Sequence, residues 1–120
     1  IDIDIPEDAF DLILNDVKQY VVWGPARYTN PRWDLKLLRL NFKGQDIDLG
    51  GAFDTKLYHA KEKKWVNSVV DFSKKREFIV DGLKVQVMDP YELIEYKKIL
   101  SRDCDKSDIE ALEKNLMKRL

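Results

Sequence analysis

The chain opens on a strict alternation of apolar and acidic residues, Ile1-Asp2-Ile3-Asp4-Ile5. Alternation at period two predicts a β-strand whose successive side chains point to opposite faces. We therefore expect the three isoleucines on a buried face, with Asp2 and Asp4 together on the other. Pro6 has no N–H to donate and ends the strand. Two such carboxylates indicate either a divalent-metal site at a sheet end or a solvated edge strand.

The next pattern is helical. Apolar residues recur at three-and-four spacing over residues 9–18, which predicts an amphipathic helix. Residues 20–23 predict a short strand. Residues 24–34 hold two prolines and two arginines, and we expect them to form an ordered loop.

A β-hairpin with a second acidic strand is expected next. Residues 35–42 alternate apolar and polar side chains, Lys43-Gly44 favours a turn, and residues 46–49 read Asp-Ile-Asp-Leu. If this strand neighbours the first one, Asp46 and Asp48 lie on the same side as the acidic pair at the start of the chain.

Residues 53–70 carry a mixed pattern. Residues 57–64 predict a helical turn, which would place His59 at the surface or half-buried on a helix. No cysteine or second histidine accompanies His59, so we do not expect a zinc site. The apolar residues expected in the core are Trp65, Val66, Val69 and Val70.

The C-terminal half predicts a hairpin followed by two helices. Asp89-Pro90 favours the start of the first helix, and Ser107 with Glu110 fits a capping box that opens the second. In order, the expected elements are a hairpin (77–80 and 83–88, turning at Asp81-Gly82), a helix (91–100), a polar connector (101–106) and a last helix ending at Leu120.

Composition narrows the function classes. The 120 residues suit one domain, and the net charge of −1 lacks the basic excess of a protein that grips long nucleic acid. Cys104 has no partner for an internal disulfide and suits a reducing cytoplasm, which is our expected location. No apolar run is long enough for a membrane span, so no membrane partner is expected.

With these residues in order, the chain resembles the nucleotidyltransferase superfamily related to DNA polymerase β. More narrowly, it is similar to small prokaryotic members related to abortive-infection toxins and antibiotic-modifying adenylyltransferases. The resemblance covers nearly the whole chain, and its most specific parts are residues 2–5 and 80–112. It implies a single α/β (α+β) domain, residues 1–120, with a small mixed β-sheet and helices packed on it.

The resemblance also implies a reaction. Members of this superfamily transfer a nucleoside monophosphate from an NTP to a hydroxyl or similar acceptor and release pyrophosphate, with two Mg²⁺ (or Mn²⁺) ions held by three carboxylates. Asp2 and Asp4 match the paired positions. Asp48 is preferred to Asp46 as the third catalytic and metal-binding residue, because the family places it after the buried apolar residue that follows the turn.

Two basic residues match family positions in the C-terminal half. Lys97 corresponds to a helix lysine that would direct its ammonium at the triphosphate, and a solvated helix residue is an equal alternative. Arg102 corresponds to the family's connector and is a second candidate for binding the nucleotide. With Asp105 and Asp108, however, a structural clamp between the last two helices is the favoured role for Arg102.

The chain departs from the family pattern at its start. Members carry a Gly-Ser segment about ten residues before the paired aspartates, where backbone amides cradle phosphates, and the sequence here begins at the aspartates. We expect this N-terminal part to be missing, and predict weak or no NTP turnover for the chain beginning at Ile1.

Two other functions stay open. The first is a catalytically inactive member of the fold, acting as a binding or regulatory partner of the toxin–antitoxin type. The second, a metal-dependent nuclease, ranks below it because an acidic-x-Lys signature is not convincingly placed. The acceptor can be a small molecule, RNA or a protein, and a protein partner or homo-oligomer is compatible with the sequence.

Overall fold

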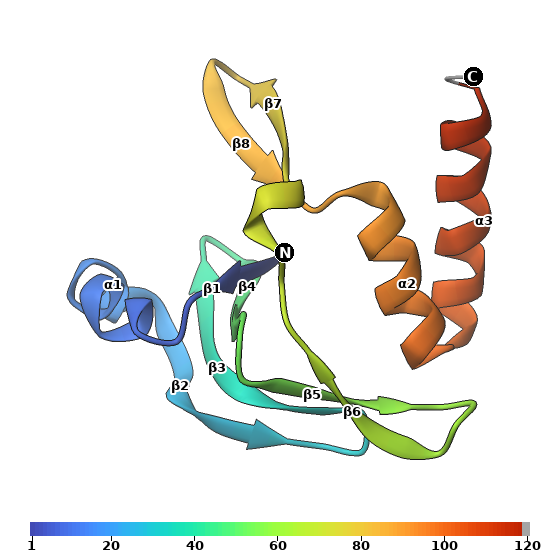
Figure 1. Ribbon diagram of the computed structural model, residues 1–120. Coiled ribbons are helices and arrows are strands. Elements are labelled where there is room, and N and C mark those ends of the chain that lie inside the picture. Colours follow the sequence, from blue (N-terminus) through green and yellow to red (C-terminus); the bar gives the residue numbers. More distant parts are fainter. Residues whose placement is uncertain (119–120) are drawn as a thin grey trace. The chain divides into compact units, whose positions relative to one another are not determined.

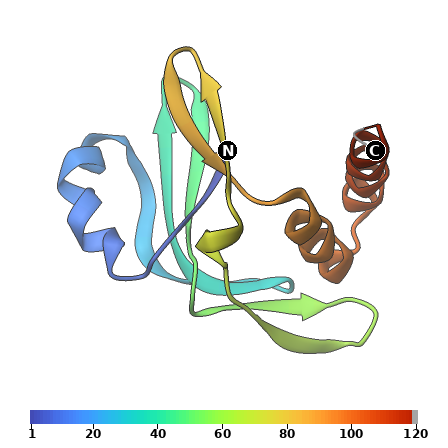
Figure 2. The same ribbon diagram turned by 45° about the horizontal axis from the view of Figure 1, so that its top comes forward.

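The computed structural model describes residues 1–118, which divide into two compact units. The first unit comprises residues 1–58 and 65–70, and the second comprises residues 59–64 together with the chain from Asp71 onward (Figures 1 and 2). Within the described residues, no helix is long and apolar enough to cross a membrane.

The first unit is built on a mixed β-sheet. Over the described residues the sheet has six strands in the order β1-β4-β3-β5-β6, with β2 paired to β3. The β1–β4 pair is parallel, whereas β3 runs antiparallel to β2, β4 and β5. The strands are β1 (Asp2–Ile5), β2 (Val21–Thr29), β3 (Trp33–Phe42), β4 (Gln45–Gly51), β5 (Thr55–His59) and β6 (Lys64–Ser68).

One face of this sheet is covered by helix α1 (Ala9–Val17), followed by a short 3₁₀ turn, η1 (Lys18–Tyr20). Phe10 of α1 is fully buried against a cluster from β3 and β4, which makes it the anchor of the core. The helix predicted for residues 9–18 is confirmed. The cluster contains Phe10, Leu38, Leu40 and Leu49.

The expectation that all three N-terminal isoleucines are buried is wrong. Ile1 and Ile3 are 67% and 43% exposed, and only Ile5 packs against the α1 core. Strand β1 ends the strand order of the described sheet, and its sole strand neighbour there is β4, so little covers its first residues.

The ordered loop expected at residues 24–34 is also wrong, because β2 continues to Thr29. Two register shifts, on either side of Trp23, let an edge strand accommodate the cis Gly24-Pro25 segment. Gly24 has φ +83°, and a Cβ placed on it would lie 2.3 Å from the Leu37 carbonyl oxygen. Only glycine fits there.

The helical turn expected over residues 57–64 is instead the hairpin of β5 and β6. His59 ends β5 and accepts a hydrogen bond from the Glu62 backbone N–H through Nδ1, at 3.2 Å. Trp65 and Val69, expected in the core, are 42% and 65% exposed. A five-residue strand is too short for its period-two pattern to stand out against a helical one.

The second unit contains a hairpin and two helices that lie side by side (Figure 1). Asp81 and Gly82 both have positive φ, as a two-residue hairpin turn requires, which confirms the predicted turn. The elements are η2 (Phe72–Lys74), β7 (Arg76–Val80), β8 (Leu83–Val87), α2 (Pro90–Leu100) and α3 (Asp103–Met117).

Both helices of this unit begin differently from a simple capping pattern. Asp89 occupies the N-cap of α2 as predicted, but its carboxylate makes no capping bond and lies 3.4 Å from Arg76 Nε. Helix α3 begins at Asp103, so Ser107 is interior and the expected 101–106 connector is wrong.

Helix α3 is capped by Asp105 instead of Ser107. Ser101, which directly follows α2, adopts a left-handed conformation (φ 52°) that ends that helix. The backbone N–H of Arg102 then donates to the Asp105 carboxylate at 3.0 Å. The capping-box rule failed because the N-cap is an arginine. Leu120, expected at the end of this helix, lies outside the described residues.

We predict that Phe10→Ala destabilises the protein by about 3–5 kcal/mol, because it leaves a cavity among Leu38, Leu40 and Leu49. Urea unfolding followed by circular dichroism measures the change. Leu12→Ala on the same helix is the control, since Leu12 is 78% exposed and should change stability by less than about 0.5 kcal/mol. Equal effects of the two substitutions would contradict this core.

Candidate functional site

The candidate site lies on the sheet face opposite α1. In the parallel β1–β4 pair, Asp2 stands opposite Asp48 and Asp4 opposite Gly50. Side chains opposite one another on neighbouring strands share a face, and so do residues two apart on one strand. Because Leu49 of β4 belongs to the α1 core, Asp48 lies on the opposite face of the sheet, and Asp2 and Asp4 share that face. The two acidic strands are neighbours, so the condition under which Asp48 shares a side with Asp2 and Asp4 is met.

The two β1 carboxylates affect one another. Asp4 stays partly exposed, but surrounding protein atoms shield its carboxylate from water. This partial burial raises the pKa of Asp4 above the ordinary 3.8. The negative charge of Asp2 raises the Asp4 pKa further. A cation or a donor placed beside this pair would relieve both effects.

The third carboxylate, Asp48, is bound by an arginine. Arg39 of β3 stands opposite Asp48 in the register, and its Nε donates to Oδ1 at 2.8 Å while its Nη2 donates to Oδ2 at 3.2 Å. This two-pronged pair raises the pKa of Arg39, with the hydrogen bond to Asp48 as the main cause. This partner was not predicted from the sequence. The hairpin register, counted back from the Lys43-Gly44 turn, carries the signal.

The carboxylate oxygens suit the ligand preference of Mg²⁺ or Mn²⁺, and the charge crowding at Asp4 is what a bound cation would relieve. Within residues 1–118, however, no group of three His, Cys, Asp or Glu side chains is placed to hold a metal ion. Asp2 and Asp4 stand two residues apart on one face of β1, and both oxygens of Asp48, the third candidate ligand, accept hydrogen bonds from Arg39. Asp46, the less favoured candidate for the third carboxylate, accepts a hydrogen bond from Asn41 Nδ2 at 2.9 Å.

An aromatic pair borders this face. Trp23 stands opposite Arg39 in the β2–β3 register and meets Tyr28 edge to face, with ring centroids 5.6 Å apart. Trp23 is 40% exposed. An exposed aromatic beside an arginine and carboxylates is a surface that suits a planar, charged ligand.

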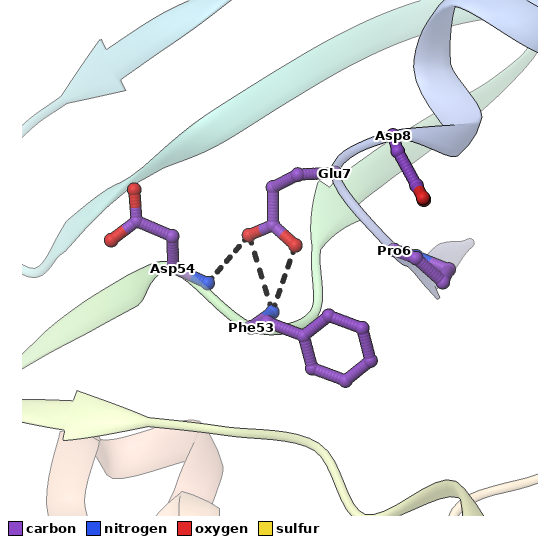
Figure 3. A pocket seen from close by; sticks show the side chains of 5 residues that line it. All are labelled: Pro6, Glu7, Asp8, Phe53 and Asp54. Carbon is purple, nitrogen blue, oxygen red and sulfur yellow. Dashed lines mark hydrogen bonds between the residues drawn. The ribbon is translucent and has the colours of Figure 1, made fainter.

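Glu7 holds the end of β1 in place (Figure 3). Its carboxylate accepts hydrogen bonds from the backbone N–H groups of Phe53 and Asp54, in the connection that follows β4. Gly51 leaves room for this approach, because a Cβ there would lie 2.6 Å from Glu7 Oε2. An open hollow lined by Pro6, Glu7, Asp8, Phe53 and Asp54 surrounds the contact. Glu7 was not predicted as a functional or structural residue, because it lies between the expected strand and the expected helix.

Lys97 and Arg102 lie in the second unit, around one buried carboxylate. Asp105 is fully buried, and Arg102 donates to it from Nε at 2.7 Å and from Nη2 at 2.9 Å. Lys97 Nζ lies 2.8 Å from Asp108 Oδ2 and 3.7 Å from Asp105 Oδ1. Arg102 therefore has a structural partner, but its printed bonds go to Asp105 at the start of its own helix. The bridge between α2 and α3 is made by Lys97, whose side chain is only 16% exposed.

Hydrogen bonds and nearby charges shift the pKa values of Asp105 and Lys97 in this cluster. The Arg102 hydrogen bond, followed by Arg102 and Lys97 charge, lowers the pKa of Asp105 despite its burial. Burial lowers the pKa of Lys97, but the Asp108 hydrogen bond and the nearby carboxylates raise it by more, so the net shift is upward. The lowered carboxyl pKa stabilises the fold above pH 3.8, and this stabilisation is lost as pH falls through the folded-state pKa.

We predict that Asp105→Asn destabilises the protein by about 2–4 kcal/mol, because it leaves Arg102 and Lys97 without their shared anion. The loss falls low in the range for a buried pair, since Arg102 keeps 31% of its side chain exposed. Urea unfolding at pH 7 measures it, and the difference from wild type should narrow below about pH 4. Asp103→Asn, at a fully exposed site on the same helix, is the control. A difference that is as large at pH 3 as at pH 7 would contradict this assignment.

Comparison with known proteins bears on the fold. No family model matches this sequence, and no curated protein matches it. The structure is similar to the crystal structure of a "putative nucleotidyltransferase" from Thermotoga maritima, with a TM-score of 0.64 and 22% sequence identity. The match covers 98% of this chain and 69% of that one. The expected α+β class, a mixed sheet with helices, is confirmed, and the fold is nucleotidyltransferase-like.

Proposed function

We propose that this protein is a metal-dependent nucleotidyltransferase that transfers a nucleoside monophosphate from an NTP to an acceptor and releases pyrophosphate. The observation that carries the proposal is the parallel β1–β4 pairing, which brings Asp2, Asp4 and Asp48 to one face of the sheet. The fold shared with the Thermotoga maritima structure supports it. Kinship with toxin-related or antibiotic-modifying members would be a further refinement, which rests on the sequence resemblance.

In this proposal Asp2 and Asp4 hold Mg²⁺ or Mn²⁺, and Asp48 is the third ligand. Bound divalent ions would supply activation of the acceptor oxygen and neutralisation of the triphosphate. The chain's own contribution is a rigid backbone: the Asp48 N–H donates to the Ile1 carbonyl, and the Ala52 N–H donates to the Ile5 carbonyl. These bonds keep the acidic strands in register along their length.

The basic residues have separate roles. Arg39 and Trp23 border the carboxylates and suit the phosphates and the base of a nucleotide. Lys97 and Arg102 are engaged by Asp105 and Asp108, so contact with a triphosphate would need them to exchange those carboxylates for phosphate oxygens. The net charge of −1 favours a small-molecule or protein acceptor over RNA.

We expect Mg²⁺ together with an NTP to raise the melting temperature of the protein, and Asp4→Asn to abolish the rise, since it removes one charge from the paired ligands. Differential scanning fluorimetry with ATP, GTP, CTP and UTP, each with and without Mg²⁺, measures the effect. Asp11→Asn, at an exposed position on α1, is the matched control and should keep the full rise. The proposal fails if no nucleotide shifts the wild type, or if Asp4→Asn shifts equally.

A second candidate is the same fold without the chemistry, acting as a binding or regulatory protein. One face of the β7–β8 hairpin favours it, because five apolar side chains there are 37–69% exposed. Patches of this kind are typical of protein contacts. The five apolar side chains on this face of the hairpin belong to Phe78, Val80, Leu83, Val85 and Val87.

Native mass spectrometry of the purified protein distinguishes the two candidates. A stoichiometric second protein, with no nucleotide-dependent melting shift, would favour the binding role. A clean monomer that responds to Mg²⁺ and NTP would favour the enzyme.

A further inference from the structure

Arg39 occupies the carboxylate of Asp48, the one carboxylate that β4 contributes to the proposed ligand set. Both oxygens of Asp48 accept hydrogen bonds from the guanidinium, at 2.8 and 3.2 Å. The two residues face each other across the β3–β4 ladder, so the backbone register holds them together. The side chains are 42% and 31% exposed, which leaves the pair accessible from solvent.

Exchange of this partner cannot be driven by pH near neutrality. Asp48 raises the pKa of Arg39 above an already high value, so the guanidinium stays charged. The other groups that act on it, Tyr28 and Asp46, also favour the charged form. Near neutral pH, only a competing cation can free Asp48. To bind there, the cation must displace the hydrogen bonds that Arg39 donates to Asp48 and overcome its repulsion by the guanidinium charge.

A freed Arg39 would have a defined environment. Asp46 is already engaged by Asn41, so it is a poor substitute partner. Trp23 stands opposite Arg39 in the register, with Tyr28 packed against it. Guanidinium planes stack on aromatic rings while their N–H groups bind phosphate in two-pronged fashion. Arg39 released from Asp48 therefore remains on the acidic face, available to an anionic ligand.

We propose that Arg39 is a positioning residue that holds Asp48 in the cation-free protein and yields it to a divalent cation, so that cation binding frees a phosphate-binding guanidinium on the same face. This inference rests on the proposed function and deepens it. It makes two consequences measurable without turnover: removal of Arg39 strengthens cation binding, and cation binding changes the environment of the Arg39 side chain.

The first test is Mn²⁺ binding, read from the electron paramagnetic resonance signal of free Mn²⁺. We expect Arg39→Gln to bind Mn²⁺ on the order of tenfold more tightly than wild type, because a competing positive charge is gone. Arg39→Lys, which keeps the charge but loses the two-pronged bond, should fall between them. Circular dichroism establishes that each variant is folded.

Arg27→Gln is the matched control. Arg27 also lies in this sheet and pairs with an aspartate, its Nε lying 2.6 Å from Asp34 Oδ1, but Asp34 is outside the proposed ligand set. This substitution should leave Mn²⁺ affinity unchanged. A purely nonspecific effect of lowering the protein's positive charge would raise affinity in both variants, and that result would overturn the proposal.

The second test follows the Arg39 Nε–H resonance by NMR during titration with Mg²⁺, with the Arg27 resonance as internal reference. We expect the Arg39 signal to shift in step with cation binding, while the Arg27 signal stays constant. A structural pair that does not open would leave both signals in place.

The results separate this inference from the proposed function. Mn²⁺ binding that is equal or weaker in Arg39→Gln overturns the inference, and so does the absence of Mn²⁺ binding in every variant. Neither result decides the nucleotide-dependent melting shift and its loss in Asp4→Asn, on which the proposed function stands. Absence of that shift, with tighter Mn²⁺ binding in Arg39→Gln, would reject the enzyme while retaining cation exchange.

Discussion

The parallel pairing of β1 with β4 is the constraint on which the candidate site depends. Two short acidic strands from distant parts of the sequence carry Asp2, Asp4 and Asp48, and their pairing in this register places the three on one face. A slip of one residue would turn the β1 carboxylates towards the core side. The Glu7 contact with the Phe53 and Asp54 backbone closes the end of this pair, so a connection that looks incidental in sequence secures the site.

The two arginine–aspartate clusters show how exposure changes the meaning of the same bond. Arg102 and Lys97 surround the fully buried carboxylate of Asp105, which also caps α3. Breaking the Arg102–Asp105 pair would leave a charge that water does not reach. Arg39 and Asp48 have similar geometry, but solvent reaches both side chains. A solvated cation can therefore compete at Asp48, whereas Asp105 serves the fold.

Much of the fold could be predicted from local pattern. The α1 stripe, the β3–β4 hairpin and the Asp81-Gly82 turn depend on contacts within a few residues, where periodicity and turn chemistry are strong. The errors share another cause. Gly24-Pro25 reads as a loop, yet the register shifts of an edge strand absorb it. Residues 57–64 were ambiguous because the strands are short, and α3 starts early because Arg102 and Asp105 form an uncommon cap.

For the candidate site, the local pattern was enough to predict which carboxylates share a face of each strand, since side-chain direction follows from the backbone period. It also singled out Arg102, Asp105 and Asp108 as structural residues, although Lys97 is the residue that joins α2 to Asp105 and Asp108. Three features became apparent only in the folded chain: β1 lies beside β4, Ile1 and Ile3 stay exposed at the sheet edge, and Arg39 holds Asp48. Those outcomes depend on which strands become neighbours. That choice is made by burying Phe10, Leu38 and Leu49 together over long sequence separations, which no local pattern encodes.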